Sequence, residues 1–228
     1  MKSTAHGAQL VKLTRFGAVN AYFVREDDGL TLVDTAVKGS GNGIVAAAQA
    51  LGAPIVRIVL THGHADHAGS LDELHARLPH VPVLVGAREA RLMDGDQTME
   101  PGEPPFGGAK ILMPDTRPTV LLAPGDTVGS LEVHAAPGHT AGQIALFDPR
   151  ERTLIAGDAW ATLGGMQAVG KAKLPFPFPT LSSWHRPTAL QTARSLLDLE
   201  PARLATGHGP AVEAPTAAMR QALDRAGA

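Results

Sequence analysis

Three histidines and one aspartate lie within six residues of one another, and all four side chains can bind metal ions. They are His62, His64, Asp66 and His67, directly after an apolar run. Histidine is the commonest neutral metal ligand, and aspartate is a usual carboxylate ligand beside it. In a chain of 228 residues with 10 histidines, a chance His-x-His-x-Asp-His has a probability on the order of one in a thousand. The stretch therefore predicts a metal site.

Three further places share one pattern, in which an apolar strand ends at a His or Asp flanked by glycine. His139 stands in Pro-Gly-His-Thr, Asp158 in Gly-Asp and His208 in Gly-His-Gly. Glycine beside a ligand lets the backbone turn sharply and approach an ion closely. Together with the first stretch, these places supply enough ligands for two metal ions.

The spacing of the ligands indicates how they divide between two ions. Residues two apart in an extended segment point the same way, so His62 and His64 can bind one ion. Asp66 and His67 are adjacent and diverge, and they more naturally serve a second ion. The expected ligands are His62, His64 and His139 for the first ion, Asp66, His67 and His208 for the second, and Asp158 bridging both.

Strands and helices that alternate along the chain must position these residues. The run 55–60 is nearly all apolar and β-branched, which predicts an interior strand covered on both faces. The metal motif follows its C-terminal end, where ligands bind in open α/β sheets. Further strands are predicted at 10–14, 19–24, 30–33, 83–85, 119–122, 131–135, 143–147, 153–155 and 203–206, and helices at 44–51, 70–78, 87–93, 182–199 and 213–226.

Two segments, 94–118 and 160–180, have no periodicity and are rich in Gly, Pro and large apolar residues. Segments of this kind are usually functional. We expect them to wall an apolar pocket above the metals, although ordinary core packing would account for about half of their large side chains. The substrate is then neutral and fairly apolar. The candidate pocket residues are Met93, Phe106, Trp160, Phe176, Phe178 and Trp184.

Composition excludes several classes of function. The chain has no cysteine, which removes thiolate zinc sites and cysteine nucleophiles. The net charge is −2, and no Lys/Arg run could follow nucleic-acid phosphates. No signal peptide and no membrane-spanning run is recognisable. We expect one domain over residues 1–228, a cytoplasmic location, and a small-molecule substrate with neither nucleic acid nor membrane as partner; a homodimer is one candidate for the oligomeric state.

The motif set Thr-His-x-His-x-Asp-His, Pro-Gly-His-Thr, Gly-Asp and Gly-His-Gly resembles the metallo-β-lactamase-fold superfamily, in its glyoxalase II and lactonase-like branch. The resemblance runs from the N-terminal strands to the last helix. It implies an α/β fold, a four-layer αββα sandwich with metals at one edge of its two sheets. It also implies the ligand assignment given above, and supporting positions beside the ligands for Asp34 and Thr61.

The resemblance implies a dinuclear hydrolase that cleaves an ester, lactone or thioester. A hydroxide held between two divalent ions has a strongly depressed pKa, and the ions polarise the substrate carbonyl. Asp66 would orient that hydroxide and transfer a proton. Zinc is the expected metal, and manganese or iron would suit the same nitrogen and oxygen ligands.

Three features bear on the branch of the superfamily. Asp158 at the bridging position is unlike true β-lactamases, which lack that carboxylate, so antibiotic hydrolysis is not expected. The sequence runs for fewer than 20 residues beyond Gly209, so the added helical domain with which glyoxalase II binds glutathione is not expected. Quorum-quenching lactonases carry a pocket tyrosine, whereas the one tyrosine here, Tyr22, stands in a predicted N-terminal strand. That tyrosine is therefore expected to be missing from the pocket or replaced.

Two alternatives remain open from the sequence. The motif Thr-His-x-His-Ala-Asp-His also occurs in persulfide dioxygenases, which hold a single iron. The stretch after Asp158, Ala-Trp-Ala-Thr-Leu-Gly-Gly-Met-Gln, does not resemble theirs. The other alternative is a non-catalytic binding module that metal ions stabilise.

Overall fold

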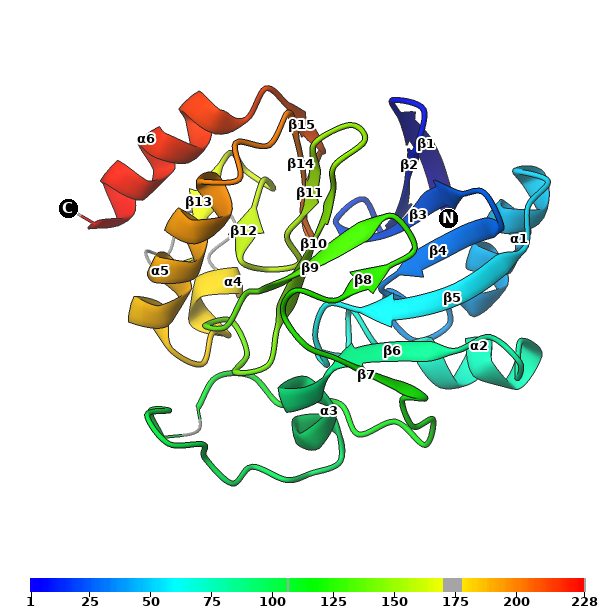
Figure 1. Ribbon diagram of the computed structural model, residues 1–228, viewed down its shortest axis with the longest axis horizontal. Helices are drawn as coiled ribbons and strands as arrows, with labels where there is room; N and C mark the ends of the chain where they lie inside the picture. Colours follow the sequence, from blue (N-terminus) through cyan, green and yellow to red (C-terminus); the bar gives the residue numbers. More distant parts are fainter. Residues whose placement is uncertain (106, 170–177, 228) are drawn as a thin grey trace.

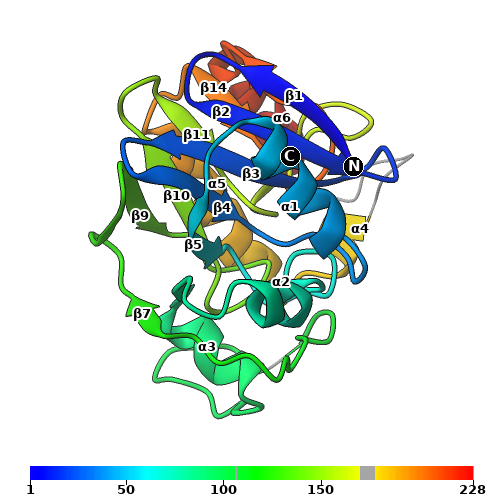
Figure 2. The same ribbon diagram turned by 90° about the vertical axis from the view of Figure 1, so that its right-hand side faces the viewer.

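Two β-sheets pack face to face, and helices cover their outer sides. The computed structural model describes residues 1–105, 107–169 and 178–227, without the side chains of residues 178 and 179. Figures 1 and 2 show helices α1 and α2 on one side of the molecule and helices α5 and α6 on the other. Within the described ranges, no helix is both long and apolar enough to span a membrane.

The first sheet has the strand order β1-β2-β3-β4-β5-β6-β7. Neighbours from β1 to β4 are antiparallel, and a tight hairpin that pairs Glu26 with Gly29 joins β3 to β4. From β4 to β7 the strands are parallel, because helices connect them. Its elements are β1 (Lys2–His6), β2 (Leu10–Arg15), β3 (Val19–Glu26), β4 (Gly29–Val33), α1 (Gly41–Ala50), β5 (Ile55–Leu60), α2 (Leu71–Arg77), β6 (Val83–Gly86), α3 (Ala87–Met93) and β7 (Val120–Leu122).

The second sheet has the strand order β15-β14-β11-β10-β9-β8, in which only β11 and β14 are parallel neighbours. A small ribbon of β12 and β13 lies apart from it. The elements of this half are β8 (Thr127–Val128), β9 (Leu131–Ala135), β10 (Ile144–Asp148), β11 (Thr153–Ile155), β12 (Trp160–Ala161), β13 (Gln167–Ala168), α4 (Phe178–Leu181), α5 (Arg186–Leu197), β14 (Arg203–Ala205), β15 (Val212–Glu213) and α6 (Thr216–Gly227).

Strand β5 shows how the sequence produces the layers. Ile58 and Leu60 point outward into a cluster that includes Ile44 of α1, whereas Val59 points the other way. Val59 shares a cluster with Leu146 of the second sheet, so this face is the core between the sheets. Because both faces of the strand are buried, its sequence is nearly all apolar, as predicted.

The outer face of the second sheet is covered in the same way. Leu154 and Leu204 of this sheet share a buried cluster with Leu196 of α5 and with Met219 and Leu223 of α6. The order of layers is therefore helix, sheet, sheet, helix. The predicted αββα sandwich is confirmed.

The helix predicted at 182–199 begins later, at Arg186. His185 is extended and caps it, because its side chain accepts the Thr188 N–H. Pro187 in the first turn also favours a start here.

The sequence did not predict six short elements: strands β1, β8, β12, β13 and β15 and the helix α4. Most of these span only two residues, which is too short for any hydrophobic period.

Candidate metal centre

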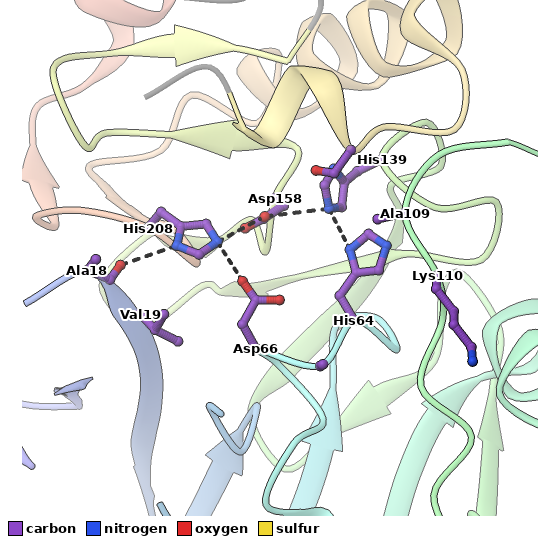
Figure 3. Close-up of a pocket in the computed structure, with 11 residues that line it drawn as sticks. Ala18, Val19, His64, Asp66, Ala109, Lys110, His139, Asp158 and His208 are labelled. Carbon is purple, nitrogen blue, oxygen red and sulfur yellow. Dashed lines mark hydrogen bonds and ion pairs between the residues drawn. The ribbon is translucent and has the colours of Figure 1, made fainter. Parts of the chain in front are cut away.

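All seven candidate ligands lie at the same edge of the two sheets, each just beyond the end of a strand. His62, His64, Asp66 and His67 follow β5, His139 follows β9, Asp158 follows β11 and His208 follows β14. Figure 3 shows His64, Asp66, His139, Asp158 and His208 turned toward one another. His64 and Asp66 share the loop after β5, and the other three come from separate segments. Strands that end at one edge of a sheet bring such residues together.

Three histidines form one group. The distance from Nε2 of His62 to Nδ1 of His64 is 3.1 Å, and that from Nδ1 of His64 to Nε2 of His139 is 2.9 Å. All three rings are buried, and burial lowers the pKa of each, that of His139 to about 3. The imidazoles are therefore neutral, with ring nitrogens that converge on one point.

A second group combines histidines with carboxylates. Nε2 of His208 lies 3.2 Å from Oδ2 of Asp66 and 3.2 Å from Oδ2 of Asp158. Nε2 of His67 lies 3.4 Å from Oδ1 of Asp158. Potential ligand atoms of Asp66, His67 and His208 all lie within 4.8 Å of one another.

Asp158 faces both groups. Its Oδ2 atom lies 3.5 Å from Nε2 of His139 and 3.2 Å from Nε2 of His208. Figure 3 shows its carboxylate between these two rings. A carboxylate in this place can bind two ions through its two oxygens.

The electrostatics of the second group favour positive charge. Burial alone would lower the pKa of His67 and His208, but the neighbouring carboxylate of Asp158 outweighs it. The pKa of His67 is raised well above its usual value, and that of His208 rises to about 10. Burial would raise the pKa of Asp66, yet the His208 hydrogen bond lowers it to about 2. The carboxylates thus stabilise cationic partners.

The buried atoms of the centre fit a metal ion. Nε2 of His67 and Oδ1 of Asp158 are buried, and neither has a hydrogen-bond partner among the residues that the structure describes. A buried polar atom without a partner costs free energy unless a ligand satisfies it. A donor set of imidazole nitrogens and carboxylate oxygens suits divalent ions of the zinc, iron and manganese type. The chemistry of the cluster therefore agrees with divalent metal binding.

Asp34 and Thr61 lie against the ligands, where the resemblance placed them. Oδ1 of Asp34 accepts the Thr61 N–H at 2.8 Å, and Oδ2 lies 2.8 Å from Nδ1 of His67. Oγ1 of Thr61 donates to Oδ2 of Asp34 at 2.9 Å and lies 3.1 Å from Nδ1 of His62. Such contacts fix the orientation of ligand rings.

Two further residues that the sequence did not reveal contact candidate ligands. Oγ of Ser183 lies 3.0 Å from Nδ1 of His139. Gln143 is buried, and its Oε1 accepts the N–H of Asp158 at 3.3 Å. Neither contact has a local sequence signal, because the partners stand 44 and 15 positions apart.

Polar residues of β3 support the loop that carries His208. Nδ2 of Asn20 donates to the carbonyls of Thr206 at 2.9 Å and Gly209 at 2.7 Å. The Tyr22 hydroxyl donates to the same Thr206 carbonyl at 2.7 Å, and Tyr22 is 1% exposed. The one tyrosine of the chain is thus a buried support of this loop and does not line the pocket.

A pocket of about 450 Å³ opens onto both groups. Five of the candidate ligands form its floor: His64, Asp66, His139, Asp158 and His208. Its walls are small residues, with one lysine at the rim: Ala18, Val19, Ala65, Ala109, Ser182 and Lys110.

The walls differ from those we expected. Met93 is 1% exposed and packs in the core beneath the metal motif. Trp160 is fully buried in the cluster between the second sheet and helices α5 and α6. Neither lines the pocket, because large apolar side chains are more stable in the core. Trp184 does not line it either, and its Nε1 donates to the carbonyl of Pro105 at 3.2 Å. Phe106, Phe176 and the side chain of Phe178 lie outside the described residues.

Known proteins are similar to this chain over most of its length. YobT of Bacillus subtilis, described as uncharacterized, is 42% identical over 220 residues, which are 94% of each chain. YflN of the same organism, described as a probable metallo-hydrolase, is 33% identical over 83% of this chain and 80% of its own. A hydroxyacylglutathione hydrolase of Synechocystis sp. is 32% identical over 55% of this chain and 48% of its own.

A solved structure and a family profile agree with these relatives. The structure of TTHA1623 in a di-iron-bound form superposes with a TM-score of 0.67 at 26% identity, over 92% of this chain and 96% of that one. The profile of the metallo-beta-lactamase superfamily matches residues 14–208. With the His/Asp clusters, these matches support divalent metal binding and a metal-dependent hydrolase. The chain belongs to the metallo-beta-lactamase superfamily.

Proposed function

We propose that this protein is a dinuclear metal-dependent hydrolase that cleaves an ester, lactone or thioester bond. The observation that carries the proposal is the position of Asp158, whose carboxylate faces a three-histidine group on one side and His208 on the other. The ligands of the two ions are those of the two groups. Zinc is the proposed metal, and the di-iron form of TTHA1623 supports iron as a second candidate.

Bound divalent ions would lower the pKa of a water molecule in the pocket and polarise the carbonyl of the substrate. The protein contributes Asp66, which lines the pocket and whose side chain is 35% exposed. Its pKa of about 2 keeps it a carboxylate at neutral pH, held through Oδ2 by His208. It can orient an attacking water by a hydrogen bond, accept its proton and pass that proton to the leaving group.

The pocket supports a small acyl substrate that is neutral and fairly apolar. Ala18, Val19, Ala65 and Ala109 line its sides, and among the described residues that line it Lys110 is the one lysine or arginine. The chain has no cysteine, so no thiol competes for the acyl group. The similarity to a hydroxyacylglutathione hydrolase supports thioesters within the proposed range of substrates.

A substrate panel combined with metal analysis tests this proposal. The purified chain is loaded with zinc and assayed on short- and long-chain lactones, esters, thioesters and phosphotriesters, and bound metal is counted per chain. Two ions with turnover of a carbonyl substrate support the proposal. One iron with oxygen uptake on a persulfide would support a dioxygenase, and two ions without turnover on any substrate would favour a binding module.

A further inference from the structure

Glu89 of α3 is a fully buried carboxylate at 0% exposure. Buried carboxylates are normally paired with a cation or satisfied by several hydrogen bonds. Within the described ranges, no ion pair involves Glu89, and three hydrogen-bond donors satisfy it instead. Burial raises the pKa of Glu89, against the effect of these donors. The position of the donors indicates what this carboxylate does.

The donors come from the two loops that carry the three-histidine group. Oε1 of Glu89 accepts the N–H of Gly63, between His62 and His64, at 2.7 Å. Oε2 accepts the hydroxyl of Thr140, next to His139, at 2.7 Å and the N–H of Gly142 at 3.2 Å. One carboxylate therefore ties the loop with two of these histidines to the loop with the third.

Both loops lie directly against α3 and have glycine at the contact. A Cβ atom on Gly63 would lie 2.7 Å from Met93 and 2.8 Å from Ile111. A Cβ atom on Gly142 would overlap the backbone of Glu89 itself. On its other side Gly63 is fixed as well, because its carbonyl accepts the N–H of Leu112 at 2.8 Å. The carboxylate thus sets the distance between two loops that cannot shift independently.

We propose that Glu89 is a positioning residue for the three-histidine metal group, holding the loop of His62 and His64 in register with that of His139. The inference rests on the proposed metal centre. It assigns α3 a role at the metal centre that the sequence of this short helix does not indicate. Residues that hold metal ligands from behind typically change metal affinity 10- to 100-fold when they are replaced.

Cobalt(II) titration of the two groups separately tests this role. Asp66→Ala combined with His208→Ala leaves the three-histidine group, and His64→Ala combined with His139→Ala leaves the other. In the first background, Glu89→Gln should weaken cobalt binding about 10- to 100-fold, because an amide cannot accept all three donors. In the second background it should change binding less than about twofold.

Glu103→Gln is the matched control. Glu103 also pairs with α3, because its carboxylate accepts from Arg88 at 2.8 Å and 2.9 Å. Its other donor among the described residues is the N–H of Glu100, which lies in neither ligand loop. This variant should leave cobalt binding to both groups unchanged. A comparable loss in the control would show that any change around α3 disturbs the centre, and would overturn the specific role of Glu89.

The outcomes separate this inference from the proposed function. If the wild-type chain binds no cobalt, the metal centre itself fails. If it binds two ions and folded Glu89→Gln binds them equally well, or loses both groups alike, the positioning role is refuted. If Glu89→Gln does not fold, Thr140→Val decides, because it removes one donor and keeps the shape of the side chain. Unchanged affinity of the three-histidine group in that variant also refutes the role.

Discussion

His62, His67 and His139 each have a neighbour on the ring nitrogen that faces away from the centre. Oγ1 of Thr61 lies by His62, Oδ2 of Asp34 by His67 and Oγ of Ser183 by His139. A neighbour on this nitrogen fixes the tautomer and the orientation of the ring. The candidate ligands are therefore oriented without an ion, which would reduce the cost of assembling the proposed centre.

Asp66→Ala is expected to lower turnover of the best panel substrate by at least about a hundredfold, the usual contribution of a positioned proton-transfer group. The fold should be retained, because Asp66 lies at the pocket surface and its ion pair is with His208, another residue of the site. The measurement is kcat with circular dichroism of the same sample. Full activity in this variant would refute the proposed site.

Gly207→Ala is expected to disrupt the second metal group. A Cβ atom here would overlap Oδ1 of Asp158 and the ring of His67. The backbone of Gly207 is not left-handed, so alanine adds a steric clash without backbone strain. We expect loss of about one metal ion per chain, measured by elemental analysis after dialysis, with the helical signal unchanged.

Gly125→Ala is the control for this prediction. Gly125 has a φ of +95° and open space around it, so alanine costs about 1 kcal/mol of backbone strain and meets nothing. Its metal content should equal that of the wild type. Wild-type metal content in Gly207→Ala would contradict the close approach of this loop to Asp158.

The sequence revealed the candidate ligands better than their neighbours. His139 and His208 are recognisable because each stands beside glycine at a strand end. Ser183 and Glu89 have no comparable mark, since a single polar side chain finds its partner only after the fold brings distant segments together. One local sign could have indicated that Glu89 is buried. It stands three and four residues before Leu92 and Met93, and therefore on the same side of the short helix α3 as these two buried residues.

At the scale of elements, the segment 94–118 has no hydrophobic period because polar contacts hold it. Arg88 of α3 pairs with Glu103, and Arg91 of α3 pairs with Asp96. Asp72 of α2 accepts the N–H of Thr116 at 2.8 Å. Contacts of this kind leave no trace in a pattern of apolar residues.

By contrast, β5, α3, β9 and β11 were predicted with correct bounds, because clear patterns and Gly or Pro boundaries define them.

Asp72→Asn tests how this segment is anchored on α2. Burial opposes ionisation of Asp72, but the hydrogen bonds from Thr116 and Asp115 outweigh it and lower its pKa. A lowered pKa means that the carboxylate stabilises the fold above its unfolded pKa of about 3.9, and that this contribution disappears as the pH falls. The residue is exposed, so we expect a loss of about 0.5 kcal/mol at pH 7.

Urea unfolding at several pH values checks this expectation. The difference in unfolding free energy between wild type and Asp72→Asn should shrink from pH 7 toward pH 3. Asp224→Asn on the exposed side of α6 should show no difference at neutral pH. An equal loss at every pH would mean that the Asp72 side chain acts through its shape and not through its charge.

At the scale of the whole molecule, the candidate centre joins the two halves of the sandwich. Four candidate ligands follow β5 of the first sheet, and three follow β9, β11 and β14 of the second. The motif set of the sequence was enough to predict this arrangement through its resemblance to a known fold. The walls of the pocket were not predictable, because the large residues of the irregular segments could equally enter the core, as Met93 and Trp160 do.

Removal of the ions should therefore loosen the contact between the sheets and lower the stability of the chain. An ion present at 100 times its dissociation constant stabilises the folded state by about 2.7 kcal/mol, if the unfolded chain does not bind it. For a chain of this size, 1 kcal/mol shifts the unfolding temperature by about 2–4 °C. Excess chelator should thus lower the midpoint by about 5–10 °C for each ion removed.

The zinc-loaded chain is melted with and without chelator, and zinc is then added back to restore the midpoint. The variant that lacks Asp66 and His208 keeps only the three-histidine group, so chelator should shift it by about half as much. Because the three-histidine group itself spans both sheets, some shift must remain in this variant. A wild-type midpoint that does not move while metal analysis shows both ions leaving would show that hydrophobic packing alone holds the sheets together.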